Sequence, residues 1–174
     1  MTDISRFAQE IGQRIQNLLD LRRVSFGSTA AIVTSMALIV GLDAATATKA
    51  AVVGSLLIIG LADNLTDSLS VHIYQEAERM AEREAFQTTV SNFIARLIVS
   101  VSFVFLFVLL PTSVAIYVCV IWGFSLLSWL SYLLARARRV RALSEICKHA
   151  AVAIVVVVVS KAIGLFVRTI MGSG

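Results

Sequence analysis

The segment from Leu97 to Ala135 contains no charged residue. A straight helix over this segment would reach about 58 Å at 1.5 Å per residue, nearly twice the roughly 30 Å of hydrocarbon in a bilayer. The segment therefore has to fold back on itself. The turn is expected at Pro111, the only proline of the chain, because proline interrupts helices. This one feature predicts two membrane spans, at about 92–110 and 113–135.

The rest of the chain adds three apolar segments of spanning length, at about 24–42, 50–75 and 147–171. Composition agrees with a membrane protein, since 58% of residues are hydrophobic and 15% are charged, against about 25% charged in soluble domains. The last segment is rich in valine, but lipid requires a helix because backbone groups must be satisfied within the segment. The sequence predicts an all-α, five-helix integral membrane domain over 24–171, in contact with the lipid bilayer.

Residues 1–23 are predicted to form an amphipathic helix. A cleavable signal is not expected, because the first twenty residues are polar and the first span begins too late. The helix either lies in the cytoplasmic membrane interface or docks on the cytoplasmic face of the protein itself, and both interpretations stay open. Its apolar residues recur at helical spacing: Ile4, Phe7, Ile11, Ile15 and Leu18.

The placement of basic residues predicts the topology. Most of the 15 Lys and Arg residues fall before the first span, between the second and third, or between the fourth and fifth; Arg96 is counted with the second group. These segments share one side of a five-span protein, and basic residues concentrate on the cytoplasmic side. We therefore expect a cytoplasmic N-terminus and an extracytoplasmic C-terminus. The net charge of +4 is explained by topology, and no nucleic-acid partner is expected.

The connection after the second span is helical in character. The segment 76–84 lacks Gly and Pro and pairs Glu with Glu and Arg with Arg at four-residue spacing, so its charges line up along a helix. The second span is predicted to continue as a cytoplasmic helical extension. These charges form either a solvated face or a small metal-collecting surface made of Glu76, Glu78, Met80 and Glu82.

Ionisable residues at membrane depth are functional candidates because they are costly there. Asp63, Asp67, Ser70 and Tyr74 share one narrow stripe of the second span, and Asn64 flanks it. Two carboxylates one helical turn apart repel each other, so one is protonated or a cation lies between them. Oxygen ligands suit divalent ions such as Mn²⁺, Fe²⁺ or Mg²⁺. These five residues are the predicted path of a transported metal cation.

Lys161 is expected at a depth similar to that of Asp63, so the two side chains are predicted to be able to pair. Two functions follow. In a carrier, Lys161 is the counter-ion or coupling group of the transport site. In a non-transporting scaffold or accessory subunit, an Asp–Lys bridge only fixes helix packing. The sequence contains no nucleophile–base arrangement, phosphate loop or CxxC pair, so neither an enzyme nor a covalently bound cofactor is expected.

A set of short segments lies in or beside the expected spans: 22–27, 31–34 and 38–42 in the first span, 62–70 in the second, 109–111 at the end of the third, and 160–164 in the fifth. These segments resemble the vacuolar iron transporter (VIT) family. The resemblance implies a five-span homodimer with a cytoplasmic N-terminus and a helical extension between spans two and three. It also implies transport of Fe²⁺ or Mn²⁺ out of the cytosol, coupled to protons.

The chain departs from the family at the positions that carry its chemistry. Where the family has an acidic residue in the first span this chain has Ala30, and Asp67 and Val71 replace a methionine and a glutamate of the second span. Lys161 replaces an aromatic residue of the fifth span. The resemblance therefore implies that the acidic chemistry has moved to Asp63 and Asp67.

Overall fold

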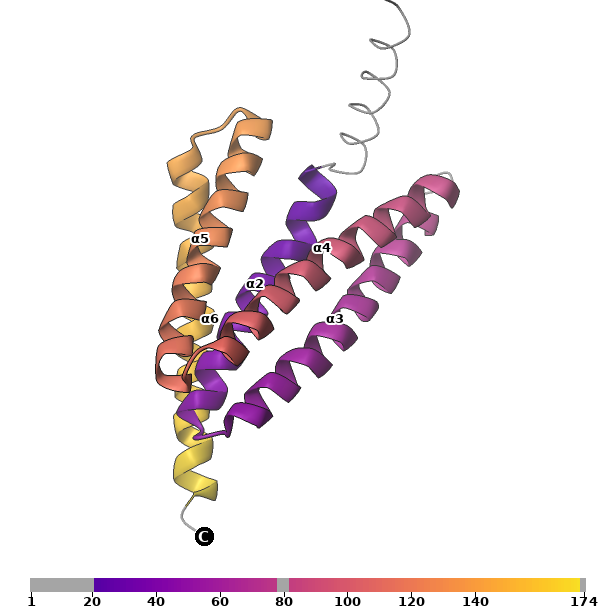
Figure 1. Cartoon of the computed structure of the whole chain (residues 1–174). Coiled ribbons are helices and arrows are strands. Elements are labelled where there is room, and N and C mark those ends of the chain that lie inside the picture. Colours follow the sequence, from indigo (N-terminus) through magenta and orange to yellow (C-terminus); the bar gives the residue numbers. More distant parts are fainter. Residues whose placement is uncertain (1–20, 78–81, 173–174) are drawn as a thin grey trace, which may run out of the picture.

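The computed structural model describes residues 21–77 and 82–172 (Figure 1). The predicted amphipathic helix falls almost entirely outside these residues. The described residues form five helices, all long and apolar enough to cross a membrane, which confirms the predicted all-α five-helix membrane domain. The helices are α2 (Leu21–Ala44), α3 (Lys49–Ala77), α4 (Glu82–Leu109), α5 (Thr112–Arg138) and α6 (Ala142–Met171).

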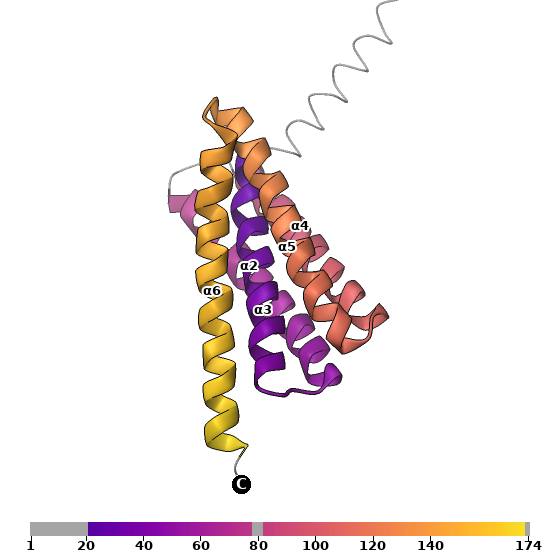
Figure 2. The same ribbon diagram turned by 90° about the vertical axis from the view of Figure 1, so that its left-hand side faces the viewer.

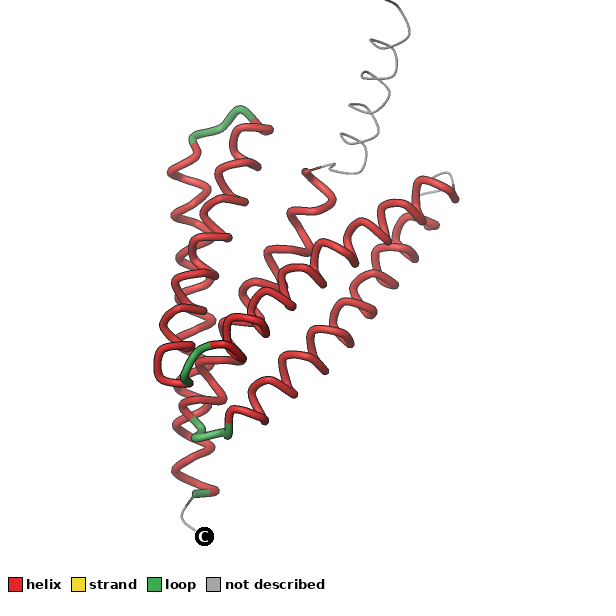
Figure 3. The backbone as a smooth tube through the Cα atoms, in the orientation of Figure 1, coloured by secondary structure: helices red, strands yellow, loops and turns green. Residues whose placement is uncertain are grey.

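Short turns reverse the chain at the predicted places (Figure 3). α4 ends at Leu109, and Pro111 caps the start of α5 with an extended backbone, φ −58° and ψ 142°. Proline fits this N-cap position because its ring fixes φ near the observed −58° and its missing N–H interrupts the preceding helix. The fold-back predicted at Pro111 is confirmed.

Lys49 ties the start of α3 to the end of α4. Its Nζ donates to the carbonyl oxygens of Val108, at 2.9 Å, and Leu110, at 2.8 Å. The last carbonyls of a helix have no partner within the helix, and a cation there also complements the helix dipole. Lys49, which the sequence places between the first two spans, therefore caps the C-terminal end of α4.

α2 is the central helix and packs against each of the other four. α3 and α4 run together on one flank of it, and α5 and α6 on the other (Figures 1 and 2). Small residues permit the closest approach, since a Cβ at Gly164 of α6 would lie 2.1 Å from the carbonyl oxygen of Gly41 in α2. Close backbone contact through small residues is typical of membrane helices.

The two ends of the bundle differ in their surfaces and in their cores. We call the end where α5 meets α6 the basic end, because exposed Arg136, Arg138, Arg139 and Arg141 lie there; α2 begins and α3 ends at the same end (Figure 1). The buried residues toward the other end are apolar and include Ile39, Val52, Leu56, Phe103 and Phe107. Those toward the basic end are largely polar: Ser28, Asn64, Ser68, Asn92, Arg96 and Ser100.

Candidate functional site

A buried arginine organises the polar half of the core. Arg96 of α4 is buried, and its guanidinium reaches three side chains of α3. Nε donates to Asn64 Oδ1 at 2.8 Å, one terminal nitrogen lies 3.0 Å from Asp63 Oδ2, and the other contacts Asp67 Oδ2. We call these four residues the arginine cluster.

The local sequence explains why α3 can surround one guanidinium. Asp63, Asn64 and Asp67 occupy positions i, i+1 and i+4, which lie on one side of a helix. The planar guanidinium presents donors in a fixed fork that suits several oxygen acceptors at once. Because two carboxylates meet one guanidinium, the cluster keeps one formal negative charge.

The burial of the three charged groups is uneven. The side chain of Arg96 is 1% exposed, whereas those of Asp63 and Asp67 are 43% and 38% exposed. The carboxylates therefore stand at the outer side of the cluster and the arginine at its inner side. The desolvation cost of the arginine is offset by two charge-assisted pairs, while each carboxylate remains accessible.

The sequence did not predict Arg96 as a member of the candidate site, because this residue was counted with the connection between spans two and three. The structure places it within α4, so it does not contribute to the basic bias of the loops. A signal was present, since Asn92, Arg96 and Ser100 recur every fourth residue and form one polar stripe on an otherwise apolar helix.

The predicted pair of Asp63 with Lys161 does not form. Asp63 binds Arg96, and Lys161 is exposed and has no ion pair among the residues that the structure describes. The reason is axial position: Asp63 shares a cavity with Thr34, whereas α6 brings Ser160 and Gly164 against Gly41. Those two levels of α2 are about 10 Å apart, so the assumption of similar depth was wrong.

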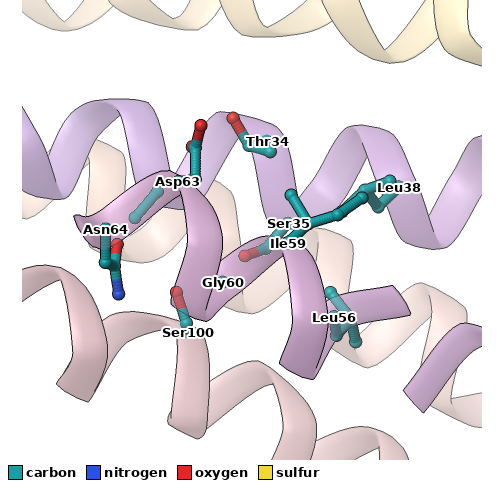
Figure 4. Close-up of a pocket in the computed structure, with 10 residues that line it drawn as sticks. Thr34, Ser35, Leu38, Leu56, Ile59, Gly60, Asp63, Asn64 and Ser100 are labelled. Atoms are coloured by element: carbon teal, nitrogen blue, oxygen red, sulfur yellow. The ribbon is translucent and has the colours of Figure 1, made fainter. Parts of the chain in front are cut away.

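Two cavities adjoin the arginine cluster along α3. The smaller has a volume of about 10 Å³ and is lined by Asp63, Asn64, Ser100 and residues of α2 such as Thr34. Figure 4 shows Asp63 on the side of α3 that faces Thr34, with Asn64 and Ser100 on the side of α4. Space of this size holds one water molecule.

The larger cavity lies toward the basic end and measures about 330 Å³. Asp67, Ser70, Val71 and Tyr74 of α3 and Asn92 of α4 line it. The predicted path residues thus fall into two groups. Three of them contact Arg96, and Ser70 and Tyr74 extend from Asp67 toward the basic end.

The predicted cytoplasmic metal surface falls mostly outside the described residues. Glu78 and Met80 lie in the gap, and no side-chain placement is described for Glu82. Glu76 is described and lies 3.5 Å from His72 Nε2. Within residues 21–77 and 82–172, no group of three or more His, Cys, Asp or Glu side chains is placed to hold a metal ion.

No family model matches the sequence, and neither a curated protein nor a solved structure matches it. The resemblance to the VIT family therefore remains a prediction. Function is inferred from the arginine cluster and the two cavities beside it.

Proposed function

We propose that the chain is a membrane carrier for a divalent metal cation, with Asp63 and Asp67 as its binding pair. The observation that carries the proposal is the way Arg96 holds them. It engages Oδ2 of each carboxylate, and within the described part of the chain no hydrogen bond is assigned to either Oδ1. Two carboxylates are thereby fixed one helical turn apart, each with an oxygen available to a cation.

The charge of the cluster supports a cationic cargo. Arginine stays protonated in proteins, so Arg96 neutralises one carboxylate and leaves one negative charge for the cargo. Oxygen donors favour hard and borderline cations such as Mn²⁺ and Fe²⁺. The resemblance to the VIT family points to the same ions, to export from the cytosol coupled to protons, and to a homodimer.

The polarity of the core supports one-sided access. The larger cavity touches Asp67 from the basic end, the end predicted to be cytoplasmic from its arginines. On the other side of the cluster lies only the smaller cavity, with a volume of about 10 Å³. Beyond it the core consists of buried apolar residues such as Leu56 and Phe103. A binding site at membrane depth that opens to one side at a time is the arrangement of alternating-access carriers.

The second candidate is a non-transporting scaffold or accessory subunit. The observation in its favour is that Arg96 and Asn64 already provide the carboxylates with a buried partner network that requires no other cation. The predicted structural Asp–Lys bridge is replaced in this reading by an Asp–Arg–Asp bridge between α3 and α4. A buried polar network of this kind can specify which helices pair.

Flux through liposomes separates the two candidates. The purified protein is reconstituted, and uptake of Mn²⁺ and Fe²⁺ is followed by quenching of an entrapped fluorescent chelator while an entrapped pH dye reports protons. The carrier proposal predicts uptake above empty liposomes. Asp63→Asn with Asp67→Asn should reduce this uptake to the background, because the cargo loses both anionic ligands.

Asp43→Asn is the matched control, since it makes the same substitution at an exposed position in the last turn of α2. It should leave uptake unchanged. Undiminished uptake in the double variant would refute the assignment of the site. A folded protein without metal or proton flux would favour the scaffold.

A further inference from the structure

The turn that joins α5 to α6 concentrates positive charge at the basic end (Figure 1). We call residues 136–148 the basic turn. This stretch has five cationic side chains and one anionic side chain, so its net charge is +4. All five cations are exposed: Arg136, Arg138, Arg139, Arg141 and Lys148.

The protein itself neutralises only part of this charge. Glu145, the one acidic residue of the basic turn, pairs with Lys148 at 3.0 Å and with Arg138 at 3.6 Å. The three remaining arginines have no ion pair within the described part of the chain. Their guanidinium groups are therefore available to an anion from outside the protein.

One of these arginines occupies a position that favours glycine. Arg139 has a left-handed backbone, with φ 56° and ψ 37°. Its N–H donates to the carbonyls of Ala135 and Arg136, and the N–H of Val140 donates to the carbonyl of Ala135 at 3.0 Å, which is the usual hydrogen bonding of a helix end closed by glycine. A side chain is disfavoured in this conformation. The arginine is therefore not explained by the geometry of the turn, and its charge indicates a use outside it.

Large apolar and aromatic side chains are exposed among the arginines. Val140 and Leu143 are 45% and 74% exposed. Near the end of α5, Trp129, Tyr132 and Arg136 share one face at three- and four-residue spacing, and the Arg136 guanidinium lies 5.9 Å from the centre of the Tyr132 ring. Tryptophan and tyrosine are enriched where a membrane meets water. The surface thus combines unpaired cations with apolar groups at the end of a membrane helix.

We propose that the basic turn binds the phosphate headgroups of anionic phospholipids. A guanidinium fork suits the oxygens of a phosphate, and clusters of basic residues beside membrane helices bind anionic headgroups. The lipid also covers the apolar side chains next to the arginines, such as Leu143, which a free phosphate or an acidic polypeptide in water would leave exposed. This inference does not depend on the proposed carrier function.

Quenching of Trp129 by brominated lipids measures which lipid lies next to the basic turn. The chain has two tryptophans, so Trp122→Phe keeps an aromatic ring at 122 and leaves Trp129, which is 67% exposed, as the only reporter. This protein is reconstituted into mixtures of phosphatidylglycerol and phosphatidylcholine, with one or the other brominated in its acyl chains. Each basic residue near an anionic surface raises the affinity about fivefold, and salt screens part of this effect. We therefore expect phosphatidylglycerol to be preferred about tenfold.

Arg139→Gly combined with Arg141→Gln removes two of the unpaired guanidinium groups. Glycine suits the positive φ at 139, and the side chain at 141 is exposed, so the double variant is expected to fold. Its preference for phosphatidylglycerol should fall to about twofold or less. Arg168→Gln is the matched control, since it removes an exposed cation in the last turn of α6 at the opposite end of the bundle. It should leave the preference unchanged.

Three results would overturn the inference. The first is equal quenching by the two brominated lipids, and the second is an unchanged preference in the double variant. The third is loss of the preference when inorganic phosphate is added at constant ionic strength, which would make free phosphate the ligand. Labelled polyglutamate, added to protein in phosphatidylcholine alone, tests an acidic polypeptide. Its binding through Arg139 and Arg141, without a preference for phosphatidylglycerol, would assign the basic turn to such a partner instead.

Discussion

Replacing Arg96 by methionine removes the central group of the arginine cluster while keeping a side chain of similar length. The variant loses three hydrogen bonds, two of them to carboxylates, and leaves Asp63 and Asp67 one turn apart without a cation between them. Breaking a fully buried ion pair costs about 3–5 kcal/mol. Because these carboxylates are about 40% exposed, hydration retains part of that energy, and we expect a loss of about 2–3 kcal/mol.

Thermal unfolding in detergent, followed by tryptophan fluorescence, measures this loss. A change of 1 kcal/mol shifts Tm by about 2–4 °C in a protein of this length, so Arg96→Met should lower Tm by about 5–10 °C. Combining it with Asp63→Asn and Asp67→Asn removes the stranded charges and should recover at least half of the loss. Arg96→Lys keeps the charge without the planar fork, so its Tm should lie between those of the natural protein and Arg96→Met.

The critical comparison is between the unfolding temperatures of the triple variant and of Arg96→Met alone. If it unfolds at the same temperature as Arg96→Met alone, the destabilisation comes from lost packing of the arginine side chain and not from unpaired carboxylates. If Arg96→Met unfolds at the temperature of the natural protein, the cluster does not stabilise the contact between α3 and α4.

Three further predictions concern helix packing, the end of α4 and Lys161; the same unfolding assay measures each of them, and liposome uptake also tests the third. Gly164→Leu should lower stability by about 3 kcal/mol, the upper range for overpacking, because its Cβ would meet the backbone of Gly41 at 2.1 Å; an unchanged Tm would show that α2 and α6 separate easily. Lys49→Met should cost about 1–2 kcal/mol, since two carbonyls at the end of α4 lose their charged donor, and Lys49→Arg should restore part of it. Lys161→Met should lower neither Tm nor cation uptake, because Lys161 is exposed and unpaired in the described structure; a clear loss of uptake would restore it to the transport site.

Much of the fold was predictable because lipid leaves few alternatives. An uncharged stretch too long for one crossing and containing one proline can only be two helices with a turn at Pro111. The candidate carboxylates were also predictable, since Asp63 and Asp67 interrupt an apolar helix at a spacing that places them side by side. Both inferences depend on local sequence, and local sequence is sufficient for them.

The counter-ion was not predictable in the same way. Arg96 was counted with the connection before the third span, and the relative depth of the helices, which decides whether Lys161 or Arg96 reaches Asp63, is not encoded in any single segment. That depth is set by packing: Gly41 against Gly164 places α6 in one register along α2, and Gly27 makes room for Asn92 and Arg96 beside α3. Such contacts join segments far apart in the chain, and no periodicity within one segment encodes them.

By itself, the sequence determined that this is a five-helix membrane protein with two acidic side chains within its second apolar helix, because the bilayer enforces helix length and helical spacing. Only the tertiary structure decided that Arg96 holds them, that Lys161 stands apart, and that a cavity adjoins Asp67. Those features depend on the relative depth and rotation of neighbouring helices, which the close packing of small residues fixes.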